Sequence, residues 1–157
     1  MSEVTASPVQ LPLRGRLLGI DFGSVRIGVA VCDPDRIVAS PLETYTRRSL
    51  ELDAFYFQTT AHTQSAVGFV VGLAISLNDV EGPKARECRA FGEWLRTVTR
   101  LPVLYWDERF TTSLAEDSLR EAGVKRDKRK GKKDRIAAQM ILQAFLEAGC
   151  PVGLAAW

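Results

Sequence analysis

The sequence predicts an α/β fold with a mixed sheet, in which three antiparallel strands come first and a parallel unit follows. Residues 17–32, LLGIDFGSVRIGVAVC, are two short apolar runs joined by a Phe-Gly-Ser turn, the pattern of a β-hairpin. A third extended segment, 36–46, follows an Asp-Pro-Asp turn. The apolar runs 67–73 and 101–107 flank a helical stretch at 83–100. A strand, helix, strand unit pairs its two strands in parallel.

The remaining elements follow from local patterns. Residues 47–61 begin with helix formers, and the continuous apolar run 67–73 is typical of a strand covered on both faces, expected to be the central parallel strand. The tetrapeptide Ser-Leu-Ala-Glu at 113–116 has the form of a capping box for a helix that stops at Gly123. A last helix is predicted at 134–148.

The length of 157 residues fits one domain with one hydrophobic core. We expect a flexible arm at 1–15, the domain at 16–150 and a tail at 151–157. The arm shows no basic stretch followed by an apolar one, so it does not resemble a secretory signal. The longest apolar run, 67–75, is far shorter than the about 20 residues of a membrane span. A cytoplasmic protein without a membrane partner is therefore expected.

Composition argues against two kinds of site. Cys32, Cys88 and Cys150 are odd in number, far apart and in no CxxC pair, and His62 is the only histidine. Neither a disulfide framework nor a zinc site is expected from such a set. The cysteines are predicted to be reduced core or surface residues.

Positive charge is concentrated in one stretch. Residues 125–135 hold eight basic and two acidic residues, a local charge of +6, whereas the whole chain carries +2 and the remainder therefore −4. Such asymmetry points to a phosphate-rich partner, although a charge run taken alone is more often a solvated loop. We expect the run 125–133 to form a mobile loop, because its charges repel one another and no apolar residue anchors it.

Three carboxylates occupy positions where open α/β sheets bind ligands. Asp21 ends the first strand, and Glu108 lies just past the strand at 101–107. Asp134 starts the last helix on the stripe that must face the core. Each alone is better explained as a turn residue, a solvated loop charge or a helix cap. Their combination is what predicts a site.

Four segments carry a resemblance to a known family. The runs LLGIDFGSVRIGVAV, VGLAI, DERFTT and KKDRIAAQMILQAFL, in this order across residues 17–148, are similar to the YqgF/RuvX family of Holliday junction resolvases and pre-16S rRNA nucleases. The resemblance implies a ribonuclease H-like fold, a five-stranded mixed sheet with helices on both faces. It also implies that Asp21, Glu108 and Asp134 form a catalytic, metal-binding triad. Ala74 departs from the family pattern, which usually has proline there.

The resemblance further implies residues that line the site, namely Arg26, Arg109, Thr111 and Thr112. Arg26 and Arg109 are candidates to clamp the scissile phosphate, because a guanidinium pairs two oxygens at once, with a surface ion pair as the alternative. The basic run would hold flanking phosphates, which gives affinity without sequence readout. The residues predicted for this role are Lys125, Arg126, Lys128, Arg129, Lys130, Lys132 and Lys133.

The chemistry of three acids agrees with a nuclease. Carboxylates without His or Cys ligands select hard cations, so Mg²⁺ or Mn²⁺ is expected, as two ions. Two such ions generate a nucleophile from water and stabilise the leaving oxygen of a phosphodiester. We predict a metal-dependent nuclease acting on structured nucleic acid, either the 5′ end of precursor 16S rRNA or Holliday junctions, with Asp21 bridging the ions.

Two other functional classes compete with this prediction. The Asp-Phe-Gly-Ser turn also resembles the first phosphate loop of actin-like ATPases and sugar kinases, but 157 residues have no room for their second lobe. A non-catalytic nucleic-acid-binding module in transcription or RNA metabolism is the stronger alternative, because YqgF-like domains without the acids occur in larger proteins. The partner is precursor rRNA or branched DNA. A symmetric junction cutter should be a homodimer, whereas an RNA-trimming enzyme need not be.

Overall fold

The computed structural model describes residues 11–75, 81–110 and 126–151, and its strands form one five-stranded sheet in the order β3-β2-β1-β4-β5. The β1–β2 and β2–β3 pairs are antiparallel, and the β1–β4 and β4–β5 pairs are parallel. This confirms the predicted mixed sheet with three antiparallel strands first. The strands are β1 (Arg16–Asp21), β2 (Arg26–Cys32), β3 (Ala39–Thr46), β4 (Ala66–Leu73) and β5 (Val103–Asp107).

The run 67–73 forms the central parallel strand, as predicted. β4 pairs parallel with β1 on one side and with β5 on the other, whereas β1 is the middle strand of the whole five-stranded sheet. β1 pairs antiparallel with β2 on one side and parallel with β4 on the other. The strand that carries Asp21 is therefore supported on both edges.

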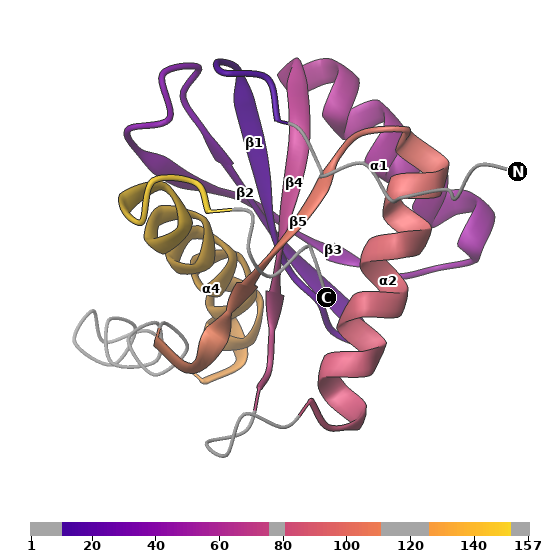
Figure 1. The fold of residues 1–157 in the computed structure, drawn as a ribbon. Helices are drawn as coiled ribbons and strands as arrows, with labels where there is room; N and C mark the ends of the chain where they lie inside the picture. Colours follow the sequence, from indigo (N-terminus) through magenta and orange to yellow (C-terminus); the bar gives the residue numbers. More distant parts are fainter. Residues whose placement is uncertain (1–10, 76–80, 111–125, 152–157) are drawn as a thin grey trace, which may run out of the picture.

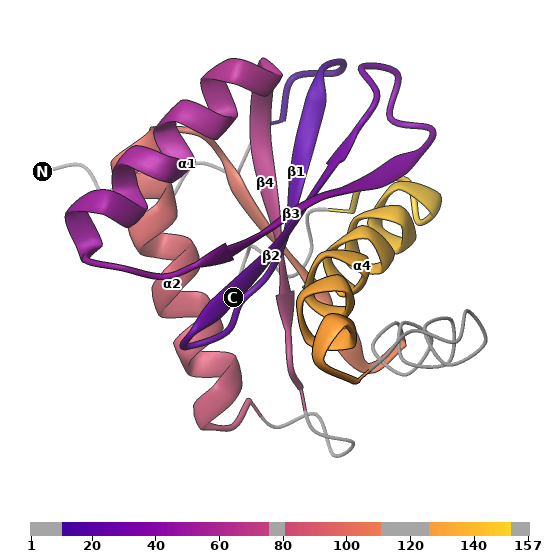
Figure 2. The ribbon, with the colours of Figure 1, turned by 180° about the vertical axis from the view of Figure 1, so that it is seen from behind.

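Helices cover both faces of the sheet, as predicted (Figure 1). Helices α1 (Leu50–Gln64) and α2 (Pro83–Thr99) cover one face, and α4 (Arg126–Glu147) covers the other, which Figure 2 shows from behind. The short 3-10 helix η1 (Glu108–Phe110) follows β5 directly. Ser49 caps α1 by accepting a hydrogen bond from the Leu52 amide at 3.2 Å. The helix predicted at 113–123 lies outside the described residues.

Helix α4 begins eight residues before the predicted start at Asp134. The expectation of a mobile loop over the basic run is therefore wrong from Arg126 onward. Lys and Arg are good helix formers, and only Asp127 and Gly131 interrupt them between Arg126 and Lys133. The Thr44 hydroxyl donates a hydrogen bond to the Gly131 carbonyl, which ties this part of the helix to β3. Asp134 consequently lies inside the helix and does not cap it.

The two faces of the sheet carry different cores. The α1 and α2 face is aromatic, with Phe57 in edge contacts to Phe69 and Phe91. The α4 face uses smaller residues, and a Cβ atom added at Gly19 would lie 2.7 Å from the Leu142 Cβ atom. Cys32 and Cys88 are free and buried, and Cys150 is free and half-buried. None of the helices within the described ranges is long and apolar enough to cross a membrane.

Candidate active site

Two of the predicted acids meet across β4 at the carboxyl end of the sheet. Asp21 is the last residue of β1, and Glu108 is the first residue after β5. Gly72 of β4 lies between them, and a Cβ atom added there would lie 2.6 Å from Glu108 Oε1. The missing side chain at Gly72 lets the Glu108 carboxylate extend over β4 toward Asp21.

The Asp21 and Glu108 carboxyl groups are hydrogen-bonded to each other. Burial, followed by the charge of Glu108, raises the pKa of Asp21 from 3.8 to about 8, and the charge of Asp134 adds to the effect. Burial also raises the pKa of Glu108. A hydrogen bond between two carboxyl groups requires a proton on one of them. At neutral pH the pair therefore holds a proton unless a cation replaces it.

Asp134 approaches the pair from α4 and is held by Arg26. Arg26 Nε donates to Asp134 Oδ2 at 2.8 Å, with the two side chains 36% and 20% exposed. Gly28 permits the approach, because a Cβ atom added there would lie 1.8 Å from the Asp134 carbonyl oxygen. Gly28 is also the residue that pairs with Asp21 across β1 and β2. The close contact of α4 with β2 thus brings the third acid to the first.

Arg109, predicted to clamp the substrate phosphate, is engaged by Asp107. The Arg109 amide donates to Asp107 Oδ1 at 3.0 Å, and its Nε donates to Asp107 Oδ2 at 2.7 Å. Asp107 follows the alternation of β5 onto the α1 and α2 face, whereas Glu108 turns to the α4 face. Sequence reasoning did not single out Asp107. Its signal would have been an acid two residues before an arginine at a strand end.

The remaining residues that were predicted to contact nucleic acid lie either at the same end of the sheet as the acids or outside the described residues. Thr111, Thr112 and Lys125 lie outside the described residues. The first turns of α4, which contain the basic run from Arg126, begin at the end of the sheet where β5 stops (Figure 1). On these turns, the Lys132 and Lys133 side chains are half-buried.

Lys84 is a site residue that sequence reasoning missed. It lies in the first turn of α2, and its Nζ donates to the Phe22 carbonyl oxygen at 3.3 Å. Its positive charge partly offsets the rise that burial causes in the pKa values of Asp21 and Glu108. An isolated lysine near a helix start carries no sequence signal of this proximity.

The donor set fits a hard divalent cation, although the Asp134 carboxylate is paired with Arg26. Among the residues that the structure describes, no three His, Cys, Asp or Glu side chains lie close enough together to hold a metal ion. Asp21 and Glu108 form a ready pair of oxygen donors, whereas Asp134 faces Arg26. Oxygen donors alone suit Mg²⁺ or Mn²⁺. A cation at the pair would relieve the repulsion that now requires a proton.

The acid pair should make the metal-free protein less stable as the pH rises. The pKa of Asp21 is about 8 in the folded protein and 3.8 ordinarily, so the folded state binds more protons between these values. We expect the free energy of unfolding to fall across pH 5 to 8, by at most about 1.4 kcal/mol per pH unit. Urea titrations in chelator measure the slope, which should be smaller in Asp21→Asn. An equal slope in that variant would assign the effect to other groups.

A family model described as "RuvX: Holliday junction resolvase" matches residues 15–148. The chain belongs to the RuvX family. A relative from Rhodopirellula baltica, named "Putative pre-16S rRNA nuclease", is 46% identical over 94% of this chain and 85% of its own length. A relative of the same name from Rhodopseudomonas palustris (strain TIE-1) is 42% identical over 88% of this chain and 87% of its own length.

Solved structures support the same fold. T. thermophilus RuvC in complex with Holliday junction substrate aligns with a TM-score of 0.51 and 13% identity, over 87% of this chain and 97% of that chain. A second structure of Thermus thermophilus RuvC aligns with a TM-score of 0.51 and 12% identity, over 86% of this chain and 97% of that chain. The fold of this RuvX chain is therefore ribonuclease H-like. Its family and curated relatives make it a nuclease, which confirms the predicted enzyme class over both alternatives.

Proposed function

We propose that this RuvX-family chain is a divalent-metal-dependent nuclease that trims the 5′ end of precursor 16S rRNA. The observation that carries the proposal is the half-buried Asp21 and Glu108 pair at the carboxyl end of the sheet, where the pKa of Asp21 is raised to about 8. Such a pair is stable at neutral pH with either a proton or a cation. The substrate is taken from the names of the curated relatives.

Each acid has a role in this proposal. Asp21 and Glu108 would hold the ions, and Asp134 would join them on leaving Arg26. Bound Mg²⁺ or Mn²⁺ would supply a nucleophile from water and stabilise the leaving oxygen. Arg26, released from Asp134, would then have its guanidinium available for the scissile phosphate. The basic turns of α4 would hold flanking phosphates.

The metal requirement is tested by removing and exchanging the ion. Cleavage should appear with Mg²⁺ or Mn²⁺ and disappear in chelator, and Ca²⁺ should bind without supporting catalysis, because its bonds are longer and its geometry looser. The melting temperature at pH 8 should rise when Mg²⁺ is added, since a cation replaces the proton of the acid pair. Undiminished cleavage in chelator would contradict the mechanism.

A Holliday junction is the second candidate substrate, favoured by the description of the matching family model. A cleavage panel with Mg²⁺ separates the two, using a synthetic precursor 16S rRNA 5′ end, a four-way DNA junction, a flap and single-stranded RNA. We expect cleavage of the precursor RNA, a reaction that does not require a dimer. Paired, symmetric cuts in the junction by a dimer, with the dimer measured by light scattering, would favour the second candidate instead.

The three free cysteines agree with a cytoplasmic location.

A further inference from the structure

Two cationic side chains, one from α2 and one from the segment between β3 and α1, converge on Phe22, the residue that directly follows Asp21. Lys84 of α2 places its Nζ 5.8 Å from the centroid of the Phe22 ring, in addition to its hydrogen bond with the Phe22 carbonyl. The Arg47 guanidinium carbon lies 5.3 Å from the same centroid. The turn after Asp21 is thus flanked by positive charge on the α1 and α2 side of the sheet.

Arg47 and Lys84 differ in the ion pairs that they form within the protein. Arg47 donates from Nε to the buried Asp53 carboxylate at 3.3 Å, and its side chain is 22% exposed. Lys84 is exposed, and no carboxylate in the described ranges 11–75, 81–110 and 126–151 forms an ion pair with it. An ammonium group has three donors, and the Phe22 carbonyl takes one of them. Lys84 is therefore the cation with donors left for an anionic ligand.

The position of Lys84 complements the basic turns of α4. Helices α2 and α4 cover opposite faces of the sheet, and both begin at the end where β1 and β4 stop (Figure 1). The Asp21 and Glu108 pair lies at the same end of the sheet, and the charge of Lys84 acts on both acids. A nucleic-acid strand held on one side only by α4 would leave the α2 side of the acids without a contact.

We propose that Lys84 binds a backbone phosphate next to the scissile one, on the α2 side of the acids, so that the substrate strand crosses the site from α4 to α2. This inference rests on the proposed function, because it assumes that the acids mark the point of cleavage. A lysine binds phosphate as a point charge, so the contact adds affinity and register without reading sequence. The hydrogen bond to the Phe22 carbonyl holds the Lys84 ammonium beside the acids.

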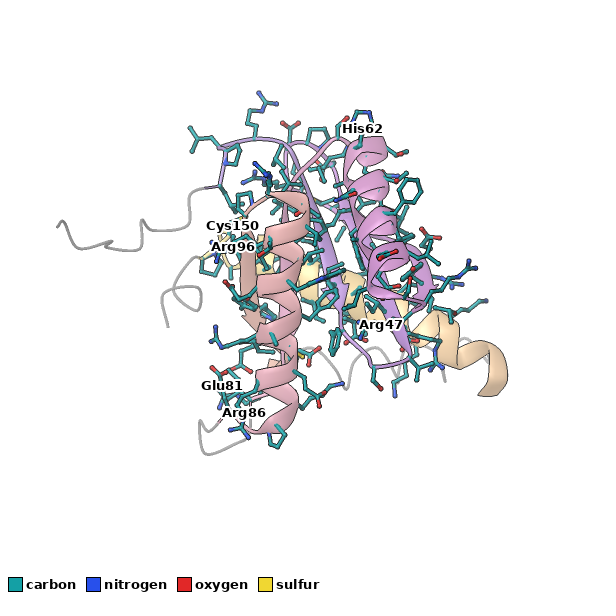
Figure 3. The ribbon with its side chains drawn as sticks, turned by 90° about the vertical axis from the view of Figure 1, so that its right-hand side faces the viewer. Arg47, His62, Glu81, Arg86, Arg96 and Cys150 are labelled. Carbon is teal, nitrogen blue, oxygen red and sulfur yellow. The ribbon has the colours of Figure 1, made fainter. Side chains whose placement is uncertain are left out.

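The matched variants are Lys84→Met and Arg86→Met. Arg86 lies two residues along the same helix and is exposed, and Figure 3 shows it on the first turns of α2, away from Arg47. Both variants remove one positive charge from α2, so general electrostatic attraction changes equally. Lys84→Arg retains the charge, and Lys84→Gln provides a second neutral variant. Melting temperatures show whether each variant is folded.

Binding is measured by fluorescence anisotropy with a labelled single-stranded RNA of the precursor 16S 5′ end, in chelator, so that no cleavage occurs. Lys84→Met and Lys84→Gln should raise Kd about tenfold, and the log–log salt slope should lose about 0.7, as expected for one phosphate contact on a single strand. Arg86→Met should stay within about twofold of the unmodified protein, and Lys84→Arg should retain most of the affinity. With Mg²⁺, Lys84→Met should raise KM far more than it lowers kcat.

Two outcomes would overturn the proposal. Equal effects of Lys84→Met and Arg86→Met on Kd and salt slope would show that Lys84 makes no specific phosphate contact. An unchanged Kd with a shifted pH–rate profile would show that Lys84 acts on the acid pair and not on the substrate. The proposed function fails separately: if the unmodified protein cuts no substrate of the panel while Lys84→Met still weakens binding, the phosphate contact stands and the nuclease assignment does not.

Discussion

Asp21→Asn is expected to lower the single-turnover cleavage rate with Mg²⁺ by about 10³-fold or more, and Glu108→Gln should do the same. Each removes an oxygen ligand whose charge is needed to hold the ions, a loss of several kcal/mol of transition-state stabilisation. The melting temperature should hold or rise, because a neutral amide relieves the repulsion between two half-buried acids that raises the pKa of Asp21. Nucleic-acid binding should remain, since the substrate is a polyanion.

Asp35→Asn is the matched control for this prediction. Asp35 is an exposed acid at the β2–β3 turn that pairs with Arg14, and it should show unchanged cleavage. Asp134→Asn should also abolish cleavage, with a small loss of stability because its pairing with Arg26 weakens. Near-normal cleavage by any of the three active-site variants would remove that residue from the site. A large fall in the melting temperature of all three variants would instead show that the acids stabilise the fold.

Gly28→Ala is expected to destabilise the protein by about 3 kcal/mol or more and to reduce cleavage with it. The added Cβ atom would lie 1.8 Å from the Asp134 carbonyl oxygen and 2.9 Å from the Arg135 amide nitrogen. Both are backbone atoms, so no side chain can rotate to make room, and α4 must move off the sheet. That movement carries Asp134 away from Asp21. Urea unfolding with Mg²⁺ measures the loss.

Gly131→Ala is the control within α4 itself. A Cβ atom there would meet nothing within 4 Å, and Gly131 is helical. Alanine should therefore stabilise the protein by about 0.5–1 kcal/mol, since glycine is the poorer helix former. If Gly28→Ala unfolded no more easily than Gly131→Ala, the contact of α4 with β2 would be looser than the structure indicates.

The sheet was predictable because its strands carry strong local signals. The alternation in 17–32 and the continuous apolar runs at 67–73 and 101–107 mark strands whatever their partners are. The placement of Asp21 and Glu108 followed from the same signals, because both acids stand at strand ends and parallel neighbours align those ends.

The details that sequence reasoning missed depend on contacts between distant segments. A basic run can be a helix or a solvated loop, and the bond from Thr44 to the Gly131 carbonyl that anchors it joins residues 87 apart. The pairing of Arg109 with Asp107 depends on side-chain rotation at the end of β5. The approach of Lys84 to Phe22 depends on how α2 packs, and no pattern within α2 encodes it.

Because the ribosome makes the chain from its N-terminus, the α4 face of the sheet is covered last. Leu17, Val70 and Leu104 on that face are buried under α4, whose core residues lie between positions 137 and 146. All five strands are synthesised before these residues emerge. A nascent chain can therefore pair its strands while one face of the sheet is still bare and Asp134 is missing. The same 22-residue helix closes the hydrophobic core and delivers the third acid, so unfinished chains lack the complete set of acids.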